Sequence, residues 1–367
     1  MKITCPRKEF FEAVSAAGQA ANARTSVNIL QTLKIEASGS TIRVVGCDGE
    51  MWVERRLSSV IEEEGAICVP AKLLVDIVNS LPDGDVHLTT SDGTNVLLTH
   101  GASEYRLHSL DPIDFPDAPD FGGESNLALS LGDFRDAVDS VIFAVSTDPH
   151  RQNITGVQLS YDGEILRLVA TDTHRLAVRE IAKSGIGSSI TAVVPAKALR
   201  AIQALPFSDE VGIELNFGNG RVGVATDTAK IVTQLLTDKY PNWERVVPAE
   251  STRSWSLERD QLGSKVRRAM IVAKDSASRL RFKGNEETLL IAARSEEKGD
   301  AKEELNMIST NGDLEIAFNG KYVLDALEPI TGPGIKVEMT ESMRPAVFRS
   351  ADEEKHYFCV IMPMSLM

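Results

Sequence analysis

The stretch VPAKLLVDIVNSLP (69–82) decides how this chain is organised, because it returns twice further along. VPAKALRAIQALP follows in the middle of the chain, and a more divergent copy, FNGKYVLDALEPI, stands near its end. The lysines of the three copies, Lys72, Lys197 and Lys321, are 125 and 124 positions apart. Nearly constant spacing is the mark of an internal repeat. The 367-residue chain therefore contains three related units.

The flanks of each copy predict β-hairpins. Apolar and polar residues alternate after each copy, in DVHLTTSDGTNVLLT, EVGIELNFGNGRVGVAT and GIKVEMTESMRPAVFR. A second strand pair precedes each copy, in LKIEASGSTIRVVGCD, VQLSYDGEILRLVATD and LRFKGNEETLLIAA. Period-2 alternation around Ser-Asp-Gly or Gly-Asn-Gly is typical of a hairpin with a tight turn.

Each unit also opens with an amphipathic helical pattern. The apolar positions of the first two are Phe10, Phe11, Val14 and Ala17, then Leu131, Phe134, Val138 and Val141. The third helix runs through LGSKVRRAMIVA. This spacing places the apolar residues on one helix face, and Ser130 with Asp133 has the spacing of a capping box. One unit is thus helix, strands, helix and strands.

Two linkers separate the units, the first rich in proline, aspartate and glycine and the second similar to it in position and in its Tyr/Phe-Pro-Asp/Asn core. DPIDFPDAPDFGGESN (111–126) and TDKYPNWERVVPAEST (237–252) each follow the last strand of a unit. We therefore expect three homologous α+β domains at 1–122, 127–246 and 250–367. Strands at the edge of such a domain need partners, so pairing between units, and between chains, would satisfy them.

The composition is that of a globular protein, with 43% hydrophobic and 25% charged residues. No apolar run approaches a membrane span, and the charged start lacks the apolar core of a secretory signal, so a cytoplasmic protein is expected. The four cysteines (Cys5, Cys47, Cys68 and Cys359) lie far apart. Free thiols are favoured over a disulfide or zinc framework.

The net charge of −14 argues against a polyanionic ligand unless basic residues gather on one face. Candidates on the expected helices are Lys8, Lys72, Lys197, Arg200, Lys265, Arg267, Arg268 and Lys321. Charge alone leaves two interpretations open, ordinary solvated helix faces or a basic lining for a polyanion.

The stretch ATDTHRLAV (170–178) holds the most suggestive polar cluster. Asp172 and His174 resemble half a metal site or a base with its orienting carboxylate. The remaining histidines form no helical pair, and no hydrolase or nucleotide-binding motif is present. A hydrogen-bonded turn at a strand end is favoured over an Asp/His hydrolase, and we expect no catalytic residue, metal or cofactor.

The chain ends on an apolar stretch, VIMPMSLM (360–367), where termini are usually polar. Buried, it is an edge strand stopped by proline. Exposed, Met362, Pro363 and Met364 would form an adaptable apolar wall.

Together, the threefold repeat, ATDTHRLAV, KYPNWERVVP and the terminal VIMPM closely resemble the beta subunit of bacterial DNA polymerase III, the sliding-clamp family, from Met1 to the end. The resemblance implies a head-to-tail homodimer that forms a six-domain ring around double-stranded DNA, without catalytic activity or cofactor. It implies as partners DNA polymerase III, other polymerases, an ATP-driven clamp loader and repair proteins. The location implied is the cytoplasm, on the nucleoid.

In this family, partners insert a short linear peptide into a pocket between the second and third domains. The positions that match it are Ile154, Thr171, Thr173, His174, Arg175, Leu176, Pro241, Arg245, Val246, Asn319, Tyr322, Val360, Met362, Pro363 and Met364. His174 and Arg175 would offer an aromatic wall and a charged tip, and Asp172 would orient Arg175 or the turn. Thr173 replaces a glycine of the family, and Ser365 replaces a terminal arginine.

The resemblance also implies contacts with DNA and with a second chain. The DNA-facing positions are Arg24, Lys72, Arg151, Gln152, Asn153, Lys197 and Arg200. Gln152 and Asn153 replace two tyrosines. At the dimer interface, Tyr105 would meet Ile271 and Val272 of the other chain. The alternative is a clamp-like paralogue, such as an inhibitor-resistance copy with an altered peptide pocket.

Overall fold

The computed structural model describes residues 1–21, 25–90, 95–121, 123, 125–274, 277–352 and 356–366. It divides into two compact units. Unit 1 comprises Met1–Phe134, Ile186–Ser188 and Lys197–Leu235, and unit 2 comprises Arg135–Gly185, Ser189–Ala196 and Leu236–Met367. The middle repeat is thus divided between the two units.

Unit 1 contains two sheets among the described residues. The N-terminal sheet has the order β5 (Val60–Glu63), β1 (Lys2–Pro6), β7 (Asp85–Thr89), β8 (Asn95–His100) and β9 (Ser103–His108). The first junction sheet has the order β10 (Ser125–Ser130), β15 (Gly212–Gly218), β16 (Arg221–Ala225), β17 (Ala229–Gln234), β4 (Met51–Ser58), β3 (Thr41–Cys47), β2 (Thr32–Ser38) and β6 (Gly65–Pro70). Its centre joins β4 of the first repeat to β17 of the second, antiparallel.

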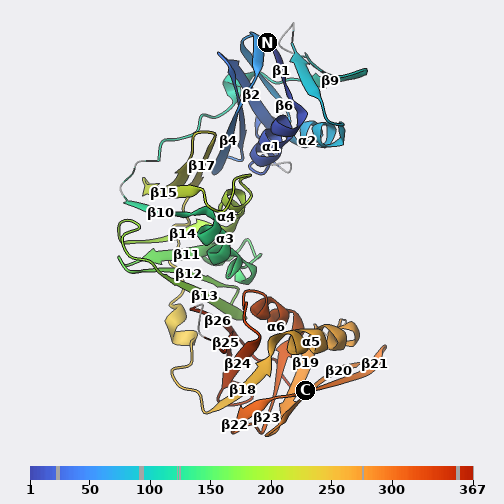
Figure 1. The fold of residues 1–367 in the computed structure, drawn as a ribbon, viewed down its shortest axis with the longest axis vertical. Helices are drawn as coiled ribbons and strands as arrows, with labels where there is room; N and C mark the ends of the chain where they lie inside the picture. Colours follow the sequence, from blue (N-terminus) through green and yellow to red (C-terminus); the bar gives the residue numbers. More distant parts are fainter. Residues whose placement is uncertain are drawn as a thin grey trace. The chain divides into compact units, whose positions relative to one another are not determined.

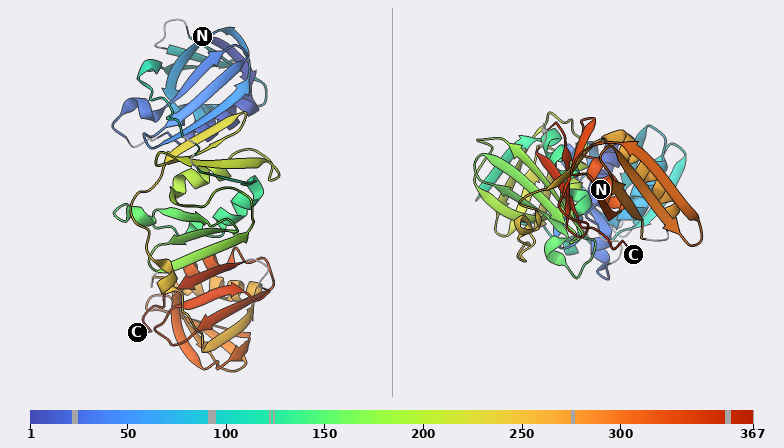
Figure 2. Two further views of the ribbon diagram at one scale, coloured as in Figure 1. Left: turned by 90° about the vertical axis from the view of Figure 1, so that its left-hand side faces the viewer. Right: turned by 90° about the horizontal axis from the view of Figure 1, so that it is seen from below.

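Unit 2 also contains two sheets within the described ranges. The second junction sheet has the order β14 (Ile190–Pro195), β11 (Gly156–Tyr161), β12 (Ile165–Thr171), β13 (Arg175–Ala182), β26 (Tyr357–Ile361), β25 (Ala346–Ser350), β24 (Gly334–Met339), β18 (Arg253–Glu258) and β22 (Ile308–Thr310). The C-terminal sheet has the order β21 (Gly299–Asn306), β20 (Thr288–Ser295), β19 (Arg279–Gly284) and β23 (Leu314–Asn319). β13 of the second repeat pairs with β26 of the third, green beside red in Figure 2.

The helices occupy the positions that the repeat predicts. They are α1 (Arg7–Gly18), α2 (Ala71–Ser80), α3 (Leu131–Asp139), α4 (Ala196–Gln203), α5 (Arg259–Ala273) and α6 (Gly320–Leu327). Short 3₁₀ segments lie at η1 (Asn28–Gln31), η2 (Pro112–Asp114), η3 (Ile142–Ala144), η4 (Gln152–Ile154) and η5 (Trp243–Val246). α1 and α2 lie side by side in unit 1, as do α5 and α6 in unit 2 (Figure 1).

Local chemistry explains where these elements begin and turn. The Ser130 hydroxyl accepts from the Asp133 N–H at 3.0 Å, which confirms the expected cap. The Gly-Asn-Gly turn between β15 and β16 has φ of 54° at Asn219 and 70° at Gly220, as a tight hairpin requires. The Ser-Asp-Gly turn of the first unit lies outside the described residues. The apolar side chains of α2 that face the core, Leu74 and Val78, are fully buried.

Candidate functional site

The stretch Thr171–Arg175 forms a tight turn between β12 and β13. The Asp172 carboxylate accepts from the backbone N–H groups of His174 at 2.9 Å and Arg175 at 3.0 Å. The Thr171 hydroxyl donates to the Arg175 carbonyl at 2.7 Å. Asp172 therefore orders the turn, as expected, through these two backbone hydrogen bonds.

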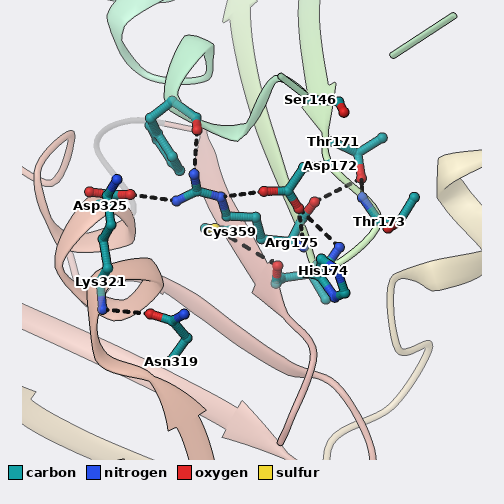
Figure 3. Close-up of polar contacts among 12 residues, drawn as sticks. Ser146, Thr171, Asp172, Thr173, His174, Arg175, Asn319, Lys321, Asp325 and Cys359 are labelled. Carbon is teal, nitrogen blue, oxygen red and sulfur yellow. Dashed lines mark hydrogen bonds and ion pairs between the residues drawn. The ribbon is translucent and has the colours of Figure 1, made fainter. Parts of the chain in front are cut away.

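Arg175 lies under the surface of this turn, with 8% of the residue exposed. Its guanidinium donates to Asp172 at 3.0 Å and to Asp325 of α6 at 2.5 Å (Figure 3). A third bond reaches the Phe143 carbonyl at 2.5 Å. The guanidinium carbon lies over the Tyr322 ring, 4.3 Å from the ring centroid. Charge-assisted bonds of this kind are strong inside a protein.

Burial alone would lower the pKa of Arg175, but the Asp325 hydrogen bond and the charges of Asp172 and Asp325 outweigh it and raise the pKa. The guanidinium therefore joins the second repeat to α6 of the third. One donor on each of Nε, Nη1 and Nη2 is engaged within unit 2, so these bonds do not support a charged tip that is free for a ligand. The assignment of Arg175 to the peptide pocket stays a prediction.

An apolar cluster lies beneath the turn. It contains Ile154, Val169, Leu176, Val178, Val193, Tyr240, Val347 and Val360 as buried members, with Leu236, Trp243, Val247 and Phe358 packed against it. The Tyr240 hydroxyl donates to the Val169 carbonyl at 3.0 Å, and burial raises the pKa of this phenol. Three expected pocket residues, Ile154, Leu176 and Val360, are thus its floor, each 2% exposed or less.

The C-terminal segment follows Val360 of this cluster and is fixed at two points. The Met362 N–H donates to the His174 carbonyl at 2.8 Å, and the Met364 N–H donates to Ala317 of β23 at 2.7 Å. Met362 is 37% exposed, while Pro363 and Met364 are half-buried. The expected edge strand is wrong, because β26 is buried inside the second junction sheet, where it pairs with β13 on one side and β25 on the other. After Ile361 the chain leaves the sheet, and of the expected apolar wall Met362 is exposed.

The remaining expected pocket residues differ in their exposure. Thr173, His174, Pro241, Arg245 and Val246 are exposed, and Asn319 and Tyr322 are half-buried. Asn319 caps α6 by accepting from the Lys321 N–H at 2.9 Å. The buried apolar cluster thus lies near exposed apolar and basic side chains in the sequence, among them Val246 and Arg245, which follow Tyr240 of the cluster.

Comparison with known proteins decides the family. Models of the DNA polymerase III beta subunit match in order, the N-terminal domain at 1–119, the central domain at 128–242 and the C-terminal domain at 244–365.

The chain belongs to the DNA polymerase III beta subunit family.

Among curated relatives, a beta sliding clamp of Staphylococcus aureus is 27% identical over 364 residues, covering 96% of this chain and 97% of the relative. A sliding clamp of Bartonella birtlesii, solved bound to griselimycin, is 26% identical with a TM-score of 0.92, and the match covers 100% of both chains. The beta subunit of Thermotoga maritima has a TM-score of 0.93 at 22% identity, covering 100% of both chains, and supports the fold alone. The α+β class and the three beta-clamp domains are therefore confirmed.

Most of the described DNA-facing positions expected from this family are exposed, but several of them already have partners within the chain. Lys72 and Arg200 are exposed on α2 and α4, whereas Lys197 Nζ lies 2.5 Å from the Asp48 carboxylate. Arg151 donates to the Thr173 hydroxyl at 2.9 Å, and Asn153 donates to the Lys239 carbonyl at 3.2 Å. Gln152 is exposed on η4. Arg24 lies outside the described residues.

The expected interface residues lie beside two unpaired strand edges. Tyr105 is half-buried on β9, the edge strand of the N-terminal sheet. Ile271 is 71% exposed near the end of α5, and Val272 beside it is half-buried. α5 packs against β20 and β21, and β21 is the edge strand of the C-terminal sheet.

The described residues contain no group of three or more His, Cys, Asp or Glu that could hold a metal ion. In the same ranges, no helix is long and apolar enough to cross a membrane. The four cysteines are free and buried, and burial raises the pKa of the Cys47 thiol to about 11 and of the Cys359 thiol to about 12.

Sequence reasoning missed two partners of Arg175. Asp325 stands four residues after Lys321, as Asp76 does after Lys72 in the first copy, and this shared spacing was the available signal. The Phe143 carbonyl is a backbone atom and leaves no signal in the sequence.

Proposed function

We propose that this protein is a DNA sliding clamp, a ring that encircles duplex DNA and tethers DNA polymerase III, with no catalytic activity of its own. The observation that carries the proposal is the order of three beta subunit domains along one chain, joined by shared sheets. Tethering raises the local concentration of polymerase at the primer end, which gives processivity without new chemistry.

The repeat itself supports a head-to-tail homodimer. Met51 pairs with Thr233 where the first repeat joins the second, and Arg175 pairs with Ile361 where the second joins the third. Met51 and Arg175 hold the same position of the repeat, so the two junctions have the same strand register. Continuing the pattern leaves β21 without a following repeat and β9 without a preceding one, and both are edges of their sheets. Pairing β9 with β21 of another chain would satisfy both edges.

The same register predicts that Tyr105 lies opposite Ala301 of the partner subunit, close to Ile271 and Val272. A double variant with cysteine at 105 and 301 should form an interchain disulfide under mild oxidation, because directly paired strand residues have suitable spacing. Each single variant is the control. A monomer at micromolar concentration, or no crosslink, would contradict the dimer.

Contacts with DNA need only be weak if the ring holds it topologically. Exposed Lys72 and Arg200 of unit 1 and exposed Gln152 of unit 2 support contacts with phosphate. We assign Arg24, Asn153 and Lys197 to such contacts as well, whereas Arg151 is bound to the Thr173 hydroxyl and is left out of this set. We expect the protein, once loaded, to stay on nicked circular DNA and to leave when the circle is cut. Loss at equal rates from circular and linear DNA would overturn the proposal.

The apolar cluster under the 171–175 turn is the proposed site for partner peptides. Burial of one leucine or phenylalanine anchor contributes roughly 1.5–3 kcal/mol, so two anchors with hydrogen bonds give roughly micromolar binding. Such affinity suits partners that exchange, and we assign the clamp loader, other polymerases and repair proteins to this site. We also propose that the protein lies in the cytoplasm, on the nucleoid. Its three domains are assigned to residues 1–122, 127–246 and 250–367.

A second candidate is a clamp-like paralogue with altered peptide binding, which the unusual turn at Thr173 favours. Competition between a polymerase-derived peptide and a fluorescent pocket ligand separates the two. Affinity for the peptide in the ordinary micromolar range removes the paralogue, whereas retention on DNA without peptide binding supports it.

A further inference from the structure

Thr173 has a backbone conformation that its residue type disfavours. Its φ is +77°, whereas the equivalent turn of the first repeat has Gly49 at φ +96°. Asp48 orders that turn as Asp172 orders this one, accepting from the N–H groups of Glu50 at 3.0 Å and Met51 at 2.8 Å. A β-branched residue in the left-handed region is strained, and such strain persists where the surroundings impose it.

The Thr173 hydroxyl makes a contact that glycine cannot make. It accepts from Arg151 Nη1 at 2.9 Å, and Arg151 Nε lies 3.5 Å from the Asp148 carboxylate. The Arg151 side chain is still 51% exposed. Its guanidinium is therefore held at two points while part of its fork of donors faces solvent.

The held guanidinium lies at the edge of the apolar site. Arg151 directly precedes η4, which carries Ile154 into the buried cluster. Thr173 directly precedes His174, whose carbonyl fixes Met362. Holding an arginine before a ligand arrives reduces the rotamer entropy lost on binding.

We propose that Thr173 is a positioning residue that holds the Arg151 guanidinium ready to bind a carboxylate beside the apolar anchors of a partner peptide. The inference rests on the proposed peptide-binding function. It makes the preferred ligand of this site an acidic peptide, and it assigns Arg151 to peptide recognition instead of to DNA phosphate. The continuity of Thr173 with His174 and Met362 favours the peptide.

The test compares two fluorescent peptides from a polymerase terminus, identical except for Asp or Asn next to the apolar anchors, by fluorescence anisotropy. The wild-type protein should prefer the Asp peptide by about 3- to 10-fold. Thr173→Ser, which keeps the hydroxyl, should keep the preference. Thr173→Val, which keeps the branched shape, and Arg151→Ala should both reduce it to less than about 2-fold.

The Asn peptide should bind all four proteins alike, which shows that the apolar site is intact. A Thr173→Val protein that keeps the wild-type preference overturns the inference. If that Thr173→Val protein also loses retention on circular DNA, the result assigns Arg151 to DNA instead of to the peptide. A wild-type protein that binds neither peptide overturns the proposed function instead.

Discussion

The two turns at Asp48–Met51 and Asp172–Arg175 have the same backbone and hold different side chains. Each aspartate accepts from the N–H groups two and three residues on. Each turn precedes a strand that joins its repeat to the next in the same register. The repeat therefore fixes the backbone at both junctions.

The side chains at equivalent positions then separate the two turns. The first has Gly49, Met51 and Trp52, while the second has Thr173, Arg175 and Leu176. Trp52 is 8% exposed, packs with Phe115, and donates from its indole N–H to the Pro116 carbonyl at 3.2 Å. The Trp52 indole fills the apolar cluster beside the first turn. In the cluster beside the second turn, the equivalent residue is the smaller Leu176. One backbone thus supports a closed core at one junction and a candidate binding site at the other.

The largest effect is expected from Arg175→Met, which gives the second turn the residue of the first. Asp172 and Asp325 lose their cation in a half-buried place, so the free energy of unfolding should fall by about 3–5 kcal/mol. Urea denaturation measures the change, with Met51→Leu as a control that should cost less than about 1.5 kcal/mol. A loss below about 1 kcal/mol would mean that Arg175 does not join the repeats.

Trp52→Leu makes the converse exchange in the first turn. Loss of the indole and its hydrogen bond should lower the free energy of unfolding by about 2–4 kcal/mol, with peptide affinity unchanged. Because burial raises the pKa of the adjacent Cys47 thiol to about 11, wild-type Cys47 should resist a thiol reagent at pH 8. The variant should be labelled there faster, as mass spectrometry can map. Equal labelling of both proteins would contradict the filling role of Trp52.

Gly49→Thr measures the strain that Thr173 carries. A Cβ built on Gly49 meets only Leu30 Cδ1, at 3.9 Å, so the cost is conformational and should be about 1–2 kcal/mol of unfolding free energy. Gly49→Asn, which tolerates this φ better, is the control and should cost less. If Gly49→Thr leaves the free energy of unfolding unchanged, this backbone conformation does not strain threonine, and the Thr173 hydroxyl offsets no strain.

Lys197→Met should have the smallest effect. The Lys197 side chain is 47% exposed, so its ion pair with Asp48 should contribute at most about 1 kcal/mol to the free energy of unfolding. The difference from wild type should shrink in 1 M salt, because screening weakens surface pairs. A larger, salt-independent loss would show that the first junction depends on this pair as the second does on Arg175.

Much of the architecture could be predicted from local patterns. The helix at Leu131 with its Ser130 cap and the Gly-Asn-Gly hairpin follow from spacing. The pairing between repeats follows from the need of edge strands for partners. The environment of Arg175 could not be predicted, because Asp325 is 150 positions away. The polar residues beside Arg175 in the sequence, Asp172 to His174, suggested that its guanidinium is exposed.

The sequence by itself determined that the chain has three related units and that each has a polar turn or linker at fixed positions, because helical and strand periods are local properties. Only the tertiary structure decided what those turns do. It divided the middle repeat between two compact units, buried Arg175 among partners from other elements, and set Thr173 in a left-handed backbone against Arg151. These outcomes depend on contacts between residues distant in the chain, which no periodicity encodes.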